Sequence, residues 1–94
     1  MKVRYTRRAN RELTAILQYL SKHSLQGMHS VKRAVESTER LIGQYPLCGR
    51  LTEVKGTRVL PMGRYPYLVY WIIDADEAKI VHIRDARRKP WRGE

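Results

Sequence analysis

The sequence predicts an α+β fold in which an N-terminal strand and a helix hairpin are followed by an antiparallel sheet of three to four strands. Two observations support this prediction. Apolar residues recur at helical spacing through residues 7–42, whereas from residue 50 onward they alternate with the period of two that is typical of strands. The chain has 94 residues with no internal repeat and no linker, so we expect one domain over residues 1–94.

The first element is expected to be a short strand over residues 2–6, where charged and apolar side chains alternate. Thr6 is a suitable N-cap for a helix over residues 7–22, because its hydroxyl can accept a hydrogen bond from an amide of the first turn. One face of this helix carries an apolar stripe, made of Ala9, Leu13, Ile16, Leu17 and Leu20. The stripe predicts a helix that packs against another element.

A second amphipathic helix is expected over residues 28–42, after an interruption of the pattern at residues 24–27. Gly43 follows the last apolar position and is the kind of residue that ends a helix. Two helices with a short connection form a hairpin, and each needs an apolar surface to cover. The sheet that follows provides this surface.

The second half of the chain is expected to form strands over residues 50–54, 57–62, 67–73 and 78–84. Pro61 predicts an edge position or an irregularity, because proline cannot donate to a strand ladder. Residues 67–73 are apolar on both faces and should form the central strand. Residues 74–77 are expected to form the hairpin turn that connects this strand to the last one.

The central strand is rich in aromatic residues, which either pack in the core or offer a stacking surface for bases. Alternation places Tyr65, Tyr67, Val69 and Trp71 on one face and Leu68, Tyr70 and Ile72 on the other. One of these faces lies opposite the helix hairpin.

The charge of the chain is strongly unbalanced. It has 19 Lys and Arg against 9 Asp and Glu, a net charge of +10. Such a field favours anionic partners, so nucleic acid, an acidic protein or both are expected to bind. The single cysteine, Cys48, cannot form an internal disulfide, and the N-terminus lacks the apolar run of a signal peptide. We therefore expect a cytoplasmic protein without a membrane-spanning segment.

A basic segment follows the last predicted strand and is the main candidate site for binding a target or a partner protein. Its residues are Arg84, Arg87, Arg88, Lys89, Trp91 and Arg92. Arginine offers a planar fork for oxyanions, and tryptophan offers a face for stacking. A solvated basic tail is the alternative interpretation.

His82, within the last strand, is the candidate acid or base beside this segment, although a packed strand histidine is the alternative. Metal-independent RNA cleavage also needs a complementary acid or base, which requires Glu53, Tyr65 or Tyr70 to approach in space. The sequence contains no phosphate-binding glycine loop, no Cys/His cluster with metal spacing and no serine nucleophile motif. It therefore predicts neither a metal nor a cofactor.

Four segments in a fixed order carry a family pattern. They are Tyr5–Ala9 leading into Leu13, Ile16 and Tyr19; the loop Pro46-x-x-Gly49-Arg50; Tyr65–Tyr70; and Ile80–Arg84 followed by Arg87, Arg88, Pro90 and Trp91. With these segments the whole chain resembles the RelE/ParE superfamily, the toxins of type II toxin–antitoxin (plasmid stabilisation) systems. The resemblance implies a strand–helix–helix–multistrand fold and a cognate antitoxin that is acidic or has an acidic toxin-binding segment.

The superfamily divides by target. The RelE-like branch implies ribosome-dependent mRNA cleavage, and its pattern has an arginine where this chain has Tyr67, a catalytic arginine that Arg88 matches, and a terminal tyrosine with no counterpart here. The ParE-like branch, described as non-enzymatic inhibitors of DNA gyrase, is therefore favoured. Two alternatives stay open: a RelE-like endoribonuclease that uses His82 and Arg88, and a small basic nucleic-acid-binding domain.

Overall fold

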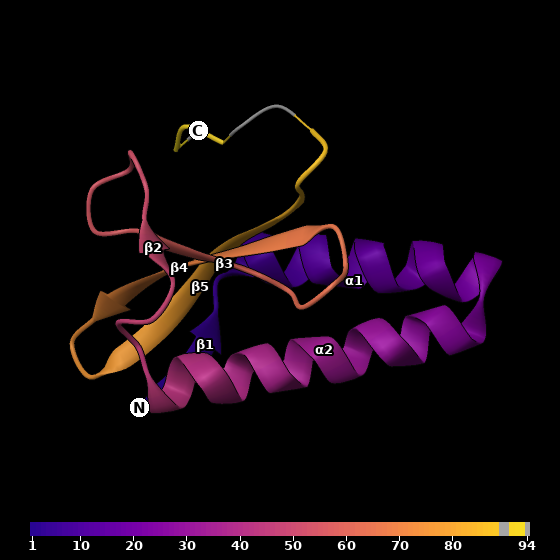
Figure 1. The fold of residues 1–94 in the computed structure, drawn as a ribbon, viewed down its shortest axis with the longest axis horizontal. Coiled ribbons are helices and arrows are strands. Elements are labelled where there is room, and N and C mark those ends of the chain that lie inside the picture. The colour runs from indigo at the N-terminus through magenta and orange to yellow at the C-terminus, as the bar shows by residue number, and fades with distance from the viewer. Residues whose placement is uncertain (89–90, 94) are drawn as a thin grey trace.

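The computed structural model of the chain describes residues 1–88 and 91–93, and in this part of the chain two antiparallel helices pack against a five-stranded sheet (Figure 1). The elements are β1 (Lys2–Tyr5), α1 (Arg7–His23), α2 (Leu25–Gln44), β2 (Arg50–Leu51), β3 (Arg58–Pro61), β4 (Tyr67–Asp74) and β5 (Glu77–Asp85). The strand order is β1-β5-β4-β3-β2, with β1 parallel to β5 and the other pairs antiparallel. The predicted fold class is confirmed, and the sheet is mixed because the N-terminal strand joins it.

The connection between the helices is shorter than the sequence pattern indicates. We expected an interruption over residues 24–27, but α2 begins at Leu25 and only Ser24 separates the helices. The Ser24 amide donates to the Leu20 carbonyl of α1 (2.7 Å), and its hydroxyl accepts from the Gly27 amide of α2 (3.0 Å). One extended residue thus ends one helix and caps the next.

The end of α2 also differs from the prediction. Gly43 does not end the helix but lies inside its last turn, because the Tyr45 amide still donates to the Leu41 carbonyl. The lack of a side chain at Gly43 instead allows the N-terminal residue to lie close to α2. The Met1 ammonium group donates to the Gly43 carbonyl (2.9 Å), and a Cβ at position 43 would lie only 3.0 Å from the Met1 carbonyl oxygen. The N-terminus of the chain therefore passes close to α2.

The strands before β4 are shorter than predicted. Strand β2 ends at Leu51, because the next residues form a turn. The Thr52 amide donates to the Thr57 carbonyl (2.9 Å), and the Thr57 amide donates to the Val54 carbonyl (3.0 Å). Since β2 pairs only with the first two residues of β3, Pro61 has no strand on that side. Its predicted edge position is confirmed.

The two faces of β4 have different surroundings. Val69 and Trp71 are buried against the helices in one hydrophobic core, in which Tyr65 and Tyr67 also pack. Tyr70 lies on the opposite face, where its ring centroid is 5.4 Å from that of His82. Residues 91–93 lie on the side of this face (Figure 1). The prediction that alternation separates these aromatic residues is confirmed, despite a bulge between Tyr70 and Trp71.

Within the described residues, neither helix is long and apolar enough to cross a membrane.

Candidate functional site

A cleft of about 680 Å³ lies between α1 and the second half of β5, and we call it the β5 cleft. It exists because β1 pairs only with residues 77–80 of β5, so that within the described chain no strand covers this edge beyond Ile80. Its lining residues are Glu12, Ala15, Ile16, Tyr19, Tyr67, His82, Ile83, Arg84, Asp85, Arg87 and Arg88. The cleft therefore combines an apolar wall from α1 and β4 with a polar wall from the end of β5.

Glu12 connects α1 to the uncovered edge of β5. Its carboxylate accepts a hydrogen bond from the Ile83 amide (3.0 Å) and lies 2.9 Å from Nδ1 of His82. Arg8, one turn earlier on α1, donates to the same carboxylate (3.2 Å). Sequence reasoning missed Glu12, because its partners lie about seventy residues away and no local pattern marks it.

His82 is 6% exposed and is oriented by Glu12. Because a carboxylate can only accept, Nδ1 carries the hydrogen of this pair. Burial lowers the pKa of His82, and the Glu12 carboxylate opposes this shift only in part. Within the described residues Nε2 of His82 makes no hydrogen bond. His82 is thus an imidazole oriented through Nδ1, and its burial disfavours the charged form.

Arg84 holds the end of β5 together. Its Nε donates to the Tyr70 hydroxyl (2.9 Å), and Nη1 donates to the carbonyls of Asp85 (3.0 Å) and Arg88 (3.2 Å). These bonds fold the segment after β5 back on the sheet. Most of the hydrogen-bonding capacity of this predicted site residue is therefore used within the chain.

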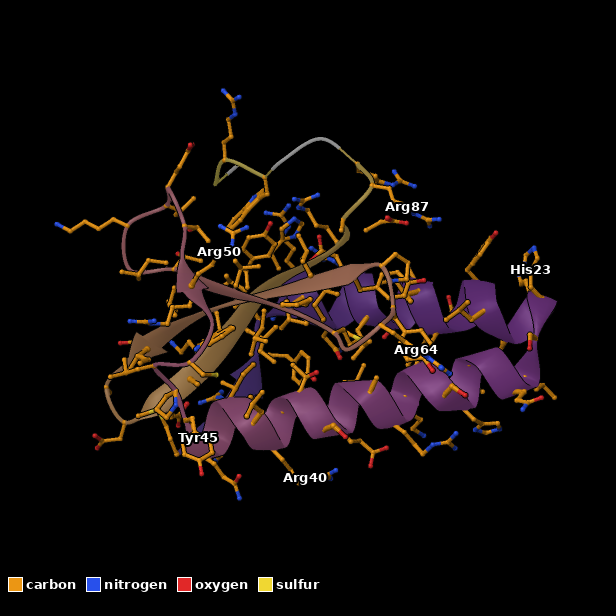
Figure 2. The ribbon with its side chains drawn as sticks, in the orientation of Figure 1. His23, Arg40, Tyr45, Arg50, Arg64 and Arg87 are labelled. Atoms are coloured by element: carbon orange, nitrogen blue, oxygen red, sulfur yellow. The ribbon has the colours of Figure 1, made fainter. Side chains whose placement is uncertain are left out.

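Arg87 forms an ion pair with Asp85 (2.6 Å) at the mouth of the cleft, and its side chain extends outward from the turn after β5 (Figure 2). The Asp85 carboxylate also accepts from the Arg87 amide (2.9 Å). The side-chain and backbone hydrogen bonds from Arg87 hold the pKa of Asp85 far below its usual range. Asp85 therefore stays ionised, and the two charges neutralise each other locally.

Trp91 packs beside Tyr70 and His82. Its ring centroid is 4.9 Å from that of Tyr70 and 4.7 Å from that of His82, and the Arg8 guanidinium lies 5.8 Å from it. Of the other predicted site residues, Arg88 lines the cleft and Arg92 is exposed, whereas Lys89 lies outside the described residues.

Among the proposed partners of His82, only Tyr70 approaches it. Tyr65 packs on the helix side of the sheet, and Glu53 is exposed in the turn between β2 and β3. The described residues contain no group of three or more His, Cys, Asp or Glu side chains that could hold a metal ion. The site is thus an arginine-rich cleft beside a Glu12–His82 pair and an aromatic cluster.

Comparison with known proteins identifies the class. The model of a family described as "ParE toxin of type II toxin-antitoxin system, parDE" matches residues 3–90. A solved structure described as "Chromosomal ParDE TA system from P. aeruginosa" superimposes with a TM-score of 0.80, covering 93% of this chain and 97% of that one at 23% identity. No curated protein matches.

The fold and the family match define a toxin of a type II toxin–antitoxin system. Within that class, the chain belongs to the ParE family.

Proposed function

We propose that this toxin inhibits DNA gyrase by binding it, without bond-breaking chemistry of its own. The main observation behind the proposal is that arginine side chains of the candidate site are already hydrogen-bonded within the chain. RNA cleavage needs cations that are available to the charge on phosphorus. Arg84 and Arg87 are hydrogen-bonded within the chain. By the family resemblance, Tyr67 stands where the RelE-like pattern has an arginine. A surface with this chemistry is suited to binding a macromolecule.

We further propose that the cognate antitoxin neutralises the toxin by placing an acidic segment with apolar side chains in the β5 cleft. Ile16 and Tyr67 form part of the apolar wall, and Arg88 adds positive charge at its rim. The net charge of +10 favours rapid encounter with an acidic partner. The family is named for the parDE pair, in which toxin and antitoxin occur together. We propose that both interactions take place in the bacterial cytoplasm.

Controlled expression in a bacterium, with and without the adjacent antitoxin gene, tests the toxin function. We expect growth arrest that co-expression reverses. Purified gyrase should lose supercoiling activity as the toxin is added, while mRNA in a translating extract stays intact. Intact supercoiling together with mRNA cut at the ribosome would reject the gyrase proposal.

Arg88→Ala tests the surface, with Arg40→Ala as the matched control on the exposed side of α2 (Figure 2). If Arg88 contacts the antitoxin or the target, its replacement weakens that complex about three- to tenfold, in keeping with one partly exposed charged contact. The control variant should bind as the unmodified chain does. Equal behaviour of the two variants would remove Arg88 from the interface.

A ribosome-dependent ribonuclease is the second candidate, and the Glu12–His82 pair favours it. A carboxylate that orients an imidazole through Nδ1 is an arrangement suited to a general base at Nε2. Tyr70 lies beside this imidazole. Should mRNA cleavage be found, His82→Gln is expected to reduce it at least about a hundredfold.

A further inference from the structure

Apolar side chains are exposed together at the end of the molecule where α2 ends and the chain turns into β2. They belong to Leu41, Tyr45, Leu47 and Leu51, and we call this group the α2–β2 patch. Each of these residues is 40–66% exposed. Single exposed leucines are common on protein surfaces, whereas a contiguous apolar patch indicates a site of interaction.

Backbone hydrogen bonds hold the helix end of the patch together. The Tyr45 amide donates to the Leu41 carbonyl (2.8 Å), so these two residues lie one turn apart at the end of α2. The Cys48 amide then donates to the Tyr45 carbonyl (2.9 Å) and turns the chain toward β2. Figure 2 shows Tyr45 where this turn begins. Leu47 therefore lies within the same tight turn as Tyr45.

Arg58 of β3 connects this turn to β2. Its Nη1 donates to the Leu47 carbonyl (2.8 Å), and it pairs directly with Leu51 across the two strands. Residues that pair directly across antiparallel strands point to the same face of the sheet. Arg58 also pairs with Trp71, which is buried against the helices, so Leu51 and Arg58 lie on the face that carries α2. The apolar side chains thus form one surface that includes Arg58.

The loop between α2 and β2 is attached to the core by its backbone and its small residues. Trp71 Nε1 donates to the Pro46 carbonyl (3.0 Å), and Cys48 packs against the core. Gly49, with a φ of 74°, lies so close to Trp71 that a Cβ would be 2.8 Å from its ring. The larger Leu47 remains in solvent. The loop thus buries small groups and holds a large apolar side chain in water.

The composition of the patch is typical of a protein–protein interface. Charged residues make up 30% of the chain, but Arg50 is the only charged residue in positions 41–51. Tyrosine and arginine are enriched at interfaces, and lysine and acidic residues are depleted from their centres. Because the loop is already held in place, a partner does not have to order it on binding.

We infer that the α2–β2 patch binds the target protein of the toxin through an acidic segment with apolar side chains. The inference rests on the proposed function, in which this target is gyrase. An acidic group opposite Arg58, with apolar groups against Leu47 and Leu51, complements the patch. A second copy of the chain does not complement it, because a twofold contact would bring Arg58 toward its own equivalent and join two chains of charge +10.

The patch and the β5 cleft lie toward opposite edges of the sheet. In the strand order β1-β5-β4-β3-β2, the cleft opens on the β1 side of β5, and β2 forms the other edge. Figure 2 shows Tyr45 of the patch far from Arg87 of the cleft. The contact with the target and the proposed contact with the antitoxin can therefore be altered separately.

Supercoiling by purified gyrase, measured over a range of toxin concentrations, tests this inference. Leu47→Ser and Leu51→Ser should each raise the concentration of the whole chain that halves supercoiling by about five- to twentyfold, because each removes an apolar contact beside Arg58. Both residues are mostly exposed, so the thermal unfolding of the variants should not change.

Leu25→Ser is the matched control. Leu25 is 62% exposed, close to the 66% of Leu47, but it lies at the opposite end of α2. Its replacement removes an exposed leucine outside the patch, so inhibition of gyrase should not change. All three variants should bind the purified antitoxin as the unmodified chain does, since none of the replaced residues lines the β5 cleft.

The possible failures can be told apart. If the unmodified chain inhibits gyrase and the Leu47 and Leu51 variants inhibit it equally well, or if the Leu25 variant loses as much, only this inference is overturned. A loss of antitoxin binding in the patch variants would assign the patch to the antitoxin, and a dimer in sedimentation that Leu47→Ser dissociates would assign it to a second copy; both would overturn the inference. An unmodified chain that leaves gyrase active would reject the proposed function and this inference with it.

Discussion

Replacing Glu12 with alanine should destabilise the fold, because this single carboxylate attaches α1 to the uncovered edge of β5. The change leaves the Ile83 amide and the Nδ1–H group of His82 without their acceptor. It also removes the ion pair between Glu12 and Arg8. Within the described residues, no other side chain of α1 is hydrogen-bonded to this part of β5.

The size of the effect follows from these contacts. A hydrogen bond to a charged group contributes about 1.5–3 kcal/mol, and the exposed pair with Arg8 adds at most about 0.5 kcal/mol. Because Glu12 is 25% exposed, water can replace part of what is lost. We therefore expect a loss of about 2–4 kcal/mol. A domain of this size has a free energy of unfolding of about 5–14 kcal/mol, so the variant remains folded.

Urea unfolding at pH 7, followed by circular dichroism, measures this loss. With an m-value of about 1.5 kcal/mol/M, the midpoint should fall by about 1.3–2.7 M without a change in m. Glu12→Gln keeps one carbonyl oxygen for the Ile83 amide and should lose about half as much. Glu36→Ala, on the exposed side of α2, is the control and should change little. Equal midpoints for the Glu12→Ala and Glu36→Ala variants would show that the contact does not stabilise the fold.

Three further predictions concern stability and are read by the same unfolding measurement. Gly49→Ala should lower the free energy of unfolding by about 3 kcal/mol or more, because the new Cβ would lie 2.6 Å from the Val59 carbonyl oxygen at a φ of 74°. Gly56→Ala has a similar φ of 75° but no atom within 4 Å of the new Cβ, so it should cost only about 1–2 kcal/mol. Equal losses in the two variants would contradict the steric argument. Because burial lowers the pKa of His82 below its unfolded value near 6.5, its contribution to stability is present above that pH and is lost as the pH falls through the folded pKa. His82→Gln should therefore flatten the pH dependence between pH 7 and 5, and an unchanged slope would show that another group causes it. Thr6→Ala should cost about 1 kcal/mol through loss of the α1 N-cap, and a loss below about 0.3 kcal/mol would show that the cap contributes little.

Local sequence signals predicted most of the fold. The apolar stripe of α1 and its Thr6 cap arise from neighbouring residues, and both are confirmed. The same holds for β4, whose apolar residues on both faces indicated the centre of the sheet. Turns that depend on a single side chain were harder to predict. We expected a four-residue break between the helices, but the Ser24 hydroxyl caps α2 so that only this residue separates them.

Long-range pairing could not be predicted from such signals. The parallel pairing of β1 with β5 joins residues about seventy-five positions apart, and nothing in either segment specifies the partner. The β5 cleft depends on this pairing, because it opens where β1 ends. For the same reason sequence reasoning found His82 and the arginines of the site but missed Glu12, which contacts β5 only in the folded chain.

The β5 cleft stays positive because its two carboxylates are already used within the chain. Glu12 is shared between Arg8 and His82, and Asp85 is paired with Arg87, whose hydrogen bonds hold the pKa of Asp85 far below its usual range. An acidic segment that enters the cleft therefore meets no competing free carboxylate there. Salt should slow its association through the overall charge of +10, whereas the apolar wall should determine how long it stays bound. The two contributions can be separated by measuring association and dissociation rates of the antitoxin complex over a range of salt concentrations.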